Sequence, residues 1–205
     1  MPKKFSDQEK ERIHAKLIET GKKLFASLGL QKTSVADLTK PIGIAQGSFY
    51  LFYDSKESLY MEIVAMEEEK VRTTVFERYL SEGPMTRSRF AVFLRESIRC
   101  IEESPILQQL YDERIVEALF RKLPPEAIEE HFTEDAGALE PFLARGRSEG
   151  WLADKDPEAV VSLIRSLVLF ALQKQRIGEK HYEATIQLLI ECIAQGLIVE
   201  RGSSE

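Results

Sequence analysis

The sequence predicts an all-α protein of about nine helices. Apolar residues recur three or four positions apart over most of the chain, as at Ile13, Leu17 and Leu24. No stretch alternates apolar and polar residues in the way that half-buried strands do. The apolar stretches are separated by helix-stopping pairs such as Gly83-Pro84 and Pro124-Pro125. Together these three observations favour helices throughout.

Residues 6–29 are predicted to form the first long helix. Ser6 and Glu9 have the spacing of a capping box, and Gly29 is the residue type that commonly follows a helix C-terminus. The apolar side chains of this helix share one face, so shorter helices can pack against it.

A helix-turn-helix motif is predicted next. Thr33 or Ser34 can cap its first helix, and Pro41 cannot continue that helix. Gly43 permits a left-handed conformation at the turn. The second helix, about Ile44 to Leu51, is expected to enter the major groove of DNA.

Small or polar side chains occupy the start of this second helix, at Ala45, Gln46, Gly47 and Ser48. Short side chains let a helix approach base edges closely. Gln can pair bidentately with adenine, and Ser can pair with several bases. Gln46 and Ser48 are therefore the predicted base-reading residues.

A long helix is predicted from Asp54, which has capping-box spacing to Glu57, to about Ser81. It is the expected sole link between two parts of opposite charge. Residues 1–56 hold ten Lys and Arg against six Asp and Glu, a net charge of +4, whereas residues 57–205 hold eighteen against twenty-eight, a net charge of −10. A basic head on an acidic body favours phosphate binding at one end, so residues 1–56 are predicted to form a DNA-binding domain.

Five further helices are predicted in the remainder of the chain from apolar spacing and from stop signals. The fourth of them has a strong start signal, because Asp156 can cap it and Pro157 suits its first position. The five ranges are 86–104, 106–124, 127–150 with an irregularity around Ala136-Gly137, 157–177 and 179–197.

The last two predicted helices indicate a homodimer. From Val160 to Leu172 the sequence is apolar on nearly every side, and a helix of this kind must be buried on both faces. A second copy of the chain is the simplest second face, with a purely internal core as the alternative. The predicted interface residues are Val160, Ile164, Leu167, Val168, Tyr182, Ile186, Leu189 and Ile193.

The helix-turn-helix and the residues after it resemble the TetR family of transcriptional regulators. The resemblance rests on Ile42-Gly43-Ile44-Ala45-Gln46-Gly47-Ser48-Phe49-Tyr50-Leu51-Phe52-Tyr53 and on Ser55-Lys56-Glu57-Ser58-Leu59. It implies phosphate contacts from Thr33, Tyr50, Tyr53 and Lys56. Pro41, Ala45 and Leu51 depart from the family pattern. The full set of expected DNA-binding residues is Thr33, Ser34, Ala45, Gln46, Gly47, Ser48, Tyr50, Tyr53 and Lys56.

The resemblance also implies that residues 57–205 form an effector-binding and dimerisation domain. The expected protein is a repressor that leaves its operator DNA when a small apolar or aromatic ligand binds. The residues expected to line the ligand pocket are Phe93, Tyr111, Phe132, Arg165, Phe170 and Gln173. A DNA-binding architectural or partner-controlled factor without an effector is the alternative, and an enzyme with a vestigial head is a second one.

Catalysis finds little support in the sequence. None of the three histidines has metal-ligand spacing, and no phosphate-binding loop or nucleophile elbow is present. We therefore expect no enzyme activity, no cofactor and no metal. Cys100 and Cys192 are too few for a disulfide framework. The longest apolar run, Leu167 to Leu172, is far too short to span a membrane, and the N-terminus lacks a signal-peptide core, so a cytoplasmic protein is expected.

Overall fold

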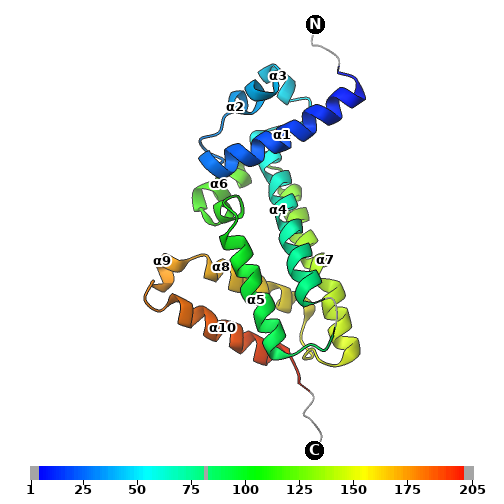
Figure 1. The fold of residues 1–205 in the computed structure, drawn as a ribbon, viewed down its shortest axis with the longest axis vertical. Helices are drawn as coiled ribbons and strands as arrows, with labels where there is room; N and C mark the ends of the chain where they lie inside the picture. Colours follow the sequence, from blue (N-terminus) through cyan, green and yellow to red (C-terminus); the bar gives the residue numbers. More distant parts are fainter. Residues whose placement is uncertain (1–4, 81–82, 201–205) are drawn as a thin grey trace, which may run out of the picture. The chain divides into compact units, whose positions relative to one another are not determined.

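The computed structural model describes residues 5–80 and 83–200, with the side chains of residues 127–136, 138, 175 and 176 left out of the description. The described residues form ten α-helices and two 3-10 segments, and their only β pairing is an isolated bridge between Leu152 and Ile198. The predicted all-α fold is thus confirmed (Figure 1). No helix in the described part of the chain is long and apolar enough to cross a membrane.

The chain divides into two compact units. Unit 1 comprises Met1–Glu69 and Ser104–Ile128, and unit 2 comprises Lys70–Glu103 and Glu129–Glu205. The expectation that one helix alone links the head to the rest of the chain is therefore wrong, because residues 104–128 pack with the N-terminal residues. The division into functional domains at residue 56 stays a prediction.

Unit 1 is built around its first and longest element, α1 (Asp7–Leu28). The predicted capping box is present, since Ser6 Oγ accepts from the Glu9 amide and the Glu9 side chain accepts from the Ser6 amide. Gly29 ends the helix with a positive φ of 82°, as expected. The other elements of unit 1 are α2 (Val35–Thr39), η1 (Lys40–Ile42), α3 (Gln46–Phe49), the first part of α4 (Lys56–Tyr79), η2 (Leu107–Tyr111) and α6 (Glu113–Lys122).

The core of unit 1 lies where α1 meets α4. A Cβ on Gly21 would lie 2.7 Å from Ile63 Cδ1, so a larger residue there would require the Ile63 side chain to shift. The Phe25 and Tyr60 rings meet edge to face at 5.4 Å, and both are fully buried. The other side chains with no exposed surface in this unit include Leu17, Leu38, Phe49 and Leu59.

Two boundaries in unit 1 differ from the sequence prediction. α4 begins at Lys56, one residue after Ser55, whose hydroxyl accepts from the Ser58 amide at 3.1 Å. Ser55 therefore takes the capping position expected for Asp54. The stretch predicted as one helix over 106–124 is split, because Asp112 has an extended backbone conformation and caps the start of α6.

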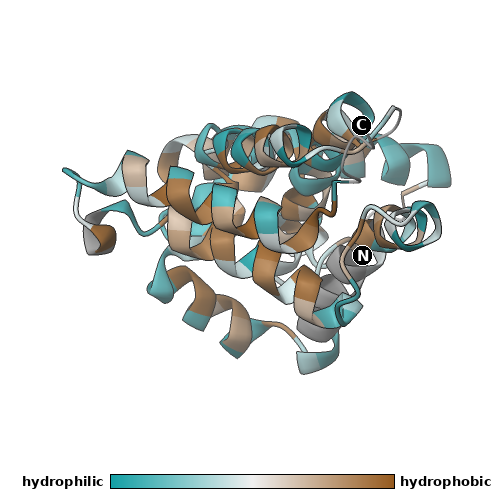
Figure 2. Ribbon diagram, turned by 90° about the horizontal axis from the view of Figure 1, so that it is seen from below, coloured by the Kyte–Doolittle hydropathy of each residue, from teal (hydrophilic) through white to brown (hydrophobic). Residues whose placement is uncertain are grey.

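Unit 2 contains the second part of α4, α5 (Arg87–Glu102), most of α7 (Pro125–Glu149), α8 (Pro157–Ala171), α9 (Lys174–Ile177) and α10 (Tyr182–Leu197). Its helices carry apolar and polar residues on different sides, as amphipathic helices do (Figure 2). α5 packs against both α8 and α10. The core includes an aromatic cluster, which we define as Phe76, Phe90, Phe93, Phe142 and Trp151, with ring centroids 5.0 to 6.4 Å apart.

Unit 2 also corrects three predicted boundaries. α7 is one continuous helix, so the irregularity expected around Ala136-Gly137 is absent from its described backbone. The helix predicted over 157–177 ends at Ala171, and Gln173 separates it from the single turn α9. α10 begins at Tyr182 rather than near Glu179, and the Tyr182 hydroxyl donates to the Ala171 carbonyl at 2.8 Å.

Candidate nucleic-acid interface

The helix-turn-helix begins at α2, which Ser34 caps. Its hydroxyl accepts from the Asp37 amide at 3.2 Å, and the Asp37 carboxylate accepts from the Ser34 amide at 2.9 Å. The Ser34 hydroxyl also donates to this carboxylate, and these hydrogen bonds lower the pKa of Asp37. The capping box fixes the start of α2 and already engages the Ser34 side chain.

The turn between the two helices follows the predicted chemistry. Pro41 lies in η1, which carries the chain out of α2, and Gly43 adopts the left-handed conformation with φ 72°. The Ile44 amide then donates to the Thr39 carbonyl at 3.3 Å. Only glycine enters this left-handed region at low cost, so the sequence determines where the chain turns.

α3 is a single turn, Gln46–Phe49, and is shorter than the helix predicted from Ile44 to Leu51. Ala45 takes the N-cap position without a side-chain hydrogen bond, so its cap is incomplete. Gln46 and Gly47 are exposed and Ser48 is half-buried. A Cβ on Gly47 would meet no atom within 4 Å, which leaves the backbone of this turn open to a large ligand.

The aromatic residues at the end of α3 separate into an inner and an outer group. The Phe49 side chain is fully buried and anchors α3 to the unit. Tyr50 is 58% exposed and Leu51 is 64% exposed. Leu51 was not among the expected DNA-binding residues, because its type departs from the family pattern.

Tyr53, for which a phosphate contact was expected, is buried within unit 1. The hydroxyl donates to Glu62 Oε2 at 2.7 Å and lies 2.8 Å from His14 Nε2. Burial and the hydrogen bond to Glu62 raise the pKa of Tyr53 well above its ordinary value. His14 Nε2 lies 3.3 Å from Glu62 Oε1, so the three side chains tie α1, the end of the helix-turn-helix and α4 together.

Thr33 and Lys56 are also engaged within unit 1. Thr33 is fully buried, and its hydroxyl donates to the Gly29 carbonyl at 2.8 Å. The Lys56 ammonium donates to the carbonyls of Leu30 and Thr33 at 2.7 Å each, and to that of Gln31 at 3.3 Å. Both side chains thus hold the turn between α1 and α2.

The expected DNA-binding residues therefore fall into two groups. Ala45, Gln46, Gly47, Ser48 and Tyr50 form one surface at α3, which we call the α3 surface. The side chains of Thr33, Ser34, Tyr53 and Lys56 make the hydrogen bonds described above, which position the elements behind it. Ser34 had a local signal of its structural role, because it caps α2. Tyr53 and Lys56 had none, because their partners lie 9 to 39 residues away in the sequence.

The residues expected to line a ligand pocket differ in burial and in the unit to which they belong. Phe93 is 3% exposed within the aromatic cluster, whereas Phe170 is 46% exposed. Tyr111 belongs to unit 1, and the side chain of Phe132 lies outside the described residues. Arg165 and Gln173 are half-buried in unit 2.

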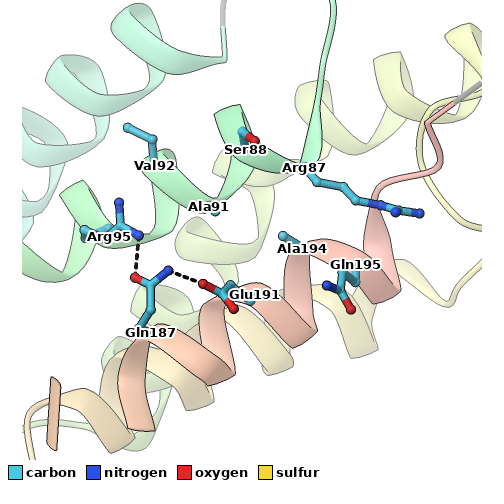
Figure 3. Close-up of a pocket in the computed structure, with 9 residues that line it drawn as sticks. All are labelled: Arg87, Ser88, Ala91, Val92, Arg95, Gln187, Glu191, Ala194 and Gln195. Atoms are coloured by element: carbon cyan, nitrogen blue, oxygen red, sulfur yellow. Dashed lines mark hydrogen bonds between the residues drawn. The ribbon is translucent and has the colours of Figure 1, made fainter. Parts of the chain in front are cut away.

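A shallow groove of about 340 Å³ lies between α5 and α10 (Figure 3). Its apolar lining residues are Ala91, Val92 and Ala194. On one side the Arg95 guanidinium donates to the Gln187 side-chain oxygen, and the Gln187 amide donates to Glu191. These hydrogen bonds engage Arg95, Gln187 and Glu191 with one another, and no residue expected for the ligand pocket lines the groove.

The residues expected at the dimer interface lie mostly inside unit 2. Six of the eight are 3 to 8% exposed, and Val168 and Leu189 are partly buried against the same core. A side chain this buried in its own subunit has little surface left for a partner. The exposed large apolar residues on the same helices are Leu163, Leu169 and Phe170 on α8 and Leu188 on α10, which is 60% exposed.

Comparisons with known proteins support the interpretation of unit 1. Residues 17–63 match the family of bacterial regulatory proteins, tetR family. The chain is 34% identical over 83 residues to the uncharacterized HTH-type transcriptional regulator YuxN of Bacillus subtilis. It is 36% identical over 59 residues to the HTH-type regulator YvdT of the same organism. These segments span 40% and 29% of this chain but only 28% of each relative.

Solved structures show the same fold over nearly the whole chain. A tetR-family transcriptional regulator from Pectobacterium atrosepticum aligns with a TM-score of 0.72 and 20% identity, covering 96% of this chain and 99% of that one. The fatty acid degradation regulator FadR from Bacillus halodurans aligns with a TM-score of 0.61 and 15% identity, covering 94% and 95%. These structures show the fold, and the match of residues 17–63 confirms the resemblance noted in the sequence.

Substitution of Lys56 tests whether its side chain is structural. We expect Lys56→Met to lower the free energy of unfolding by about 1–3 kcal/mol, because three carbonyls lose a charged donor. Urea denaturation followed by circular dichroism measures this, with Lys40→Met, at an exposed lysine of the same unit, as the control. An unchanged free energy of unfolding, together with a salt dependence of DNA binding reduced by about one unit, would instead assign Lys56 to phosphate.

Proposed function

We propose that this chain, whose residues 17–63 match the tetR family, is a transcriptional regulator that binds operator DNA with α3 in the major groove. The observation that supports this most directly is that the α3 surface, on the second helix of the helix-turn-helix, is exposed. Gln46 is the proposed base reader, with Ser48 beside it. The missing Cβ of Gly47 and the small side chain of Ala45 let the helix approach the bases closely.

Phosphate contacts are proposed for groups that the structure leaves at the surface. Tyr50 is exposed next to α3, and a tyrosine hydroxyl can donate to a phosphate oxygen. The basic charge of residues 1–56 supports attraction to DNA of any sequence. The side chains of Thr33, Ser34, Tyr53 and Lys56 contribute indirectly in this proposal, because they fix the geometry of α2 and α3.

We propose that two copies associate through α8 and α10. The exposed apolar side chains on these helices, rather than the buried ones expected from the sequence, would form the interface. Such side chains on a helix pair are typical of subunit contacts. A twofold dimer also suits a helix-turn-helix protein, because each copy can then read one half-site.

A ligand-controlled repressor is the proposed mode of regulation. The aromatic cluster of unit 2 supports a small apolar or aromatic effector, since such rings favour apolar partners. The effector would release the operator by preferring a conformation in which the α3 surfaces do not fit their half-sites. The alternative is a DNA-binding factor that responds to no small molecule.

Base reading is tested at Gln46. We expect Gln46→Ala to relax the preference at one or two base positions, at a cost of about 1–3 kcal/mol, because a bidentate contact is lost. Sequencing DNA fragments selected by each purified variant from a random pool gives the preference. Gln31→Ala changes another exposed glutamine and serves as the control. An unchanged preference in Gln46→Ala would assign base reading to other residues.

The proposed dimer interface is tested by placing a charge at Leu188. We expect Leu188→Glu to give folded monomers, because the new carboxylate would have to be buried between subunits. Light scattering measures the mass and circular dichroism the helix content. Leu28→Glu, at an exposed leucine of unit 1, should remain dimeric. Leu167→Glu should unfold the chain, because Leu167 is 4% exposed in its own core. A monomeric unmodified protein would refute the proposal.

Ligand control is tested by thermodynamic reciprocity. If a ligand weakens operator binding, operator DNA must weaken ligand binding by the same factor, typically about 5–150-fold. Calorimetric titration of each ligand found in an apolar library, with and without operator DNA, measures both affinities. DNA of scrambled sequence is the control. Equal affinities would show that the ligand does not regulate, and failure of the whole library would favour the effector-free alternative.

A further inference from the structure

The Gln109 side chain joins η2 to the end of α1. Its Nε2 donates to the Phe25 carbonyl at 2.9 Å and to the Pro105 carbonyl at 2.8 Å. Its Oε1 accepts from the Leu30 amide at 2.9 Å. The three hydrogen bonds of this one amide group thus join the end of α1 to a segment about 80 positions later in the sequence. All of these residues belong to unit 1.

The contact satisfies backbone groups that a helix end leaves open. The last carbonyls of a helix lack partners within it. The Leu30 amide, which follows Gly29, donates to Gln109 Oε1. Here the Phe25 carbonyl accepts from both Gly29 N–H and Gln109. A Cβ on Gly29 would lie 3.3 Å from Gln109 Oε1, closer than such contacts normally are. Gly29 therefore both ends α1 and leaves room for Gln109.

A second contact fixes the same segment to α4. The Tyr60 hydroxyl donates to the Ile106 carbonyl at 2.8 Å, and the Tyr60 side chain has no exposed surface. Leu107, beside it, is 2% exposed. Residues 105–109 are thus held to the start of α4 by Tyr60 and to the end of α1 by Gln109.

We propose that Gln109 is a positioning residue for DNA binding, which holds the helix-turn-helix to the chain segment that follows α5. α5 ends at Glu102, two residues before Ser104 enters unit 1. If the C-terminal end of α5 moved, the position of Leu30 would then change, because Gln109 accepts a hydrogen bond from the Leu30 amide. From Leu30 to Thr33 the turn leads directly into α2, with its carbonyls held by Lys56. This connection acts in addition to α4, and the role assigned to Gln109 rests on the proposed DNA-binding function.

The contact itself is tested by hydrogen exchange at the Leu30 amide, measured by NMR. We expect exchange about tenfold faster in Gln109→Ala, because the amide loses its acceptor. Gln108→Ala, at the exposed neighbouring glutamine, is the control and should exchange as the unmodified protein does. Unchanged exchange in Gln109→Ala would overturn the proposal.

Gln109→Glu separates hydrogen bonding from space filling. The carboxylate keeps an acceptor for Leu30 but places negative oxygens against the Phe25 and Pro105 carbonyls, at a helix end that disfavours negative charge. Exchange at the Leu30 amide should therefore be faster, and operator binding weaker, in Gln109→Glu than in Gln109→Ala. If Gln109→Glu instead behaves like the unmodified protein, Gln109 only fills space and the proposal is wrong.

Operator affinity tests the positioning role. We expect Gln109→Ala to bind operator DNA at least about fivefold more weakly, because a smaller fraction of molecules holds its helix-turn-helix in the competent orientation. Gln108→Ala should bind normally. Faster exchange with unchanged operator affinity would refute a role in positioning. If the unmodified protein selects no DNA sequence, the proposed function fails, and the exchange data still decide whether the Gln109 contact exists.

Discussion

The turn that follows α1 is the constraint on which the arrangement of unit 1 depends. A helix end leaves carbonyl groups without partners, and five residues separate the end of α1 from the cap of α2. Distant side chains supply the missing donors, since Lys56 donates to the carbonyls of Leu30, Gln31 and Thr33, and Gln109 donates to that of Phe25. The start of α4 and the segment before α6 are thereby fixed to the same turn. Because this turn leads into α2, the position of the helix-turn-helix depends on it.

Contacts with the rest of unit 1 also explain why α3 can be as short as one turn. A four-residue helix has little stability of its own, so its position comes from tertiary contacts. Phe49 anchors it from inside, and Tyr53 holds the following residues through His14 and Glu62. The exposed side of α3 is then free to carry Gln46 and Gly47, which contribute nothing to the core. Within ten positions of the sequence, some residues therefore stabilise the motif, and others are proposed to read DNA.

α8 and α10 each carry apolar side chains on two sides, one in the core of unit 2 and one exposed. Their buried side chains complete the core of unit 2, where Tyr182 also closes the end of α8 through the Ala171 carbonyl. Their remaining apolar side chains, including Leu163 and Leu188, face outward. The sequence shows that both helices are apolar on more than one side. It does not show which side faces the subunit's own core, because that depends on how α5 packs against them.

The sequence determined the local structure, because capping, turning and helix periodicity depend on neighbouring residues. It predicted the all-α fold, the capping box at Ser6, a cap at Thr33 or Ser34, the left-handed turn at Gly43 and the family resemblance. Only the tertiary structure decided which polar side chains are free. Thr33, Tyr53 and Lys56 match a phosphate-binding pattern in sequence, yet they bond to groups that folding brings near them. Gln109 carries no local signal at all, because its partners at Phe25 and Leu30 are about 80 residues away and only packing brings them together.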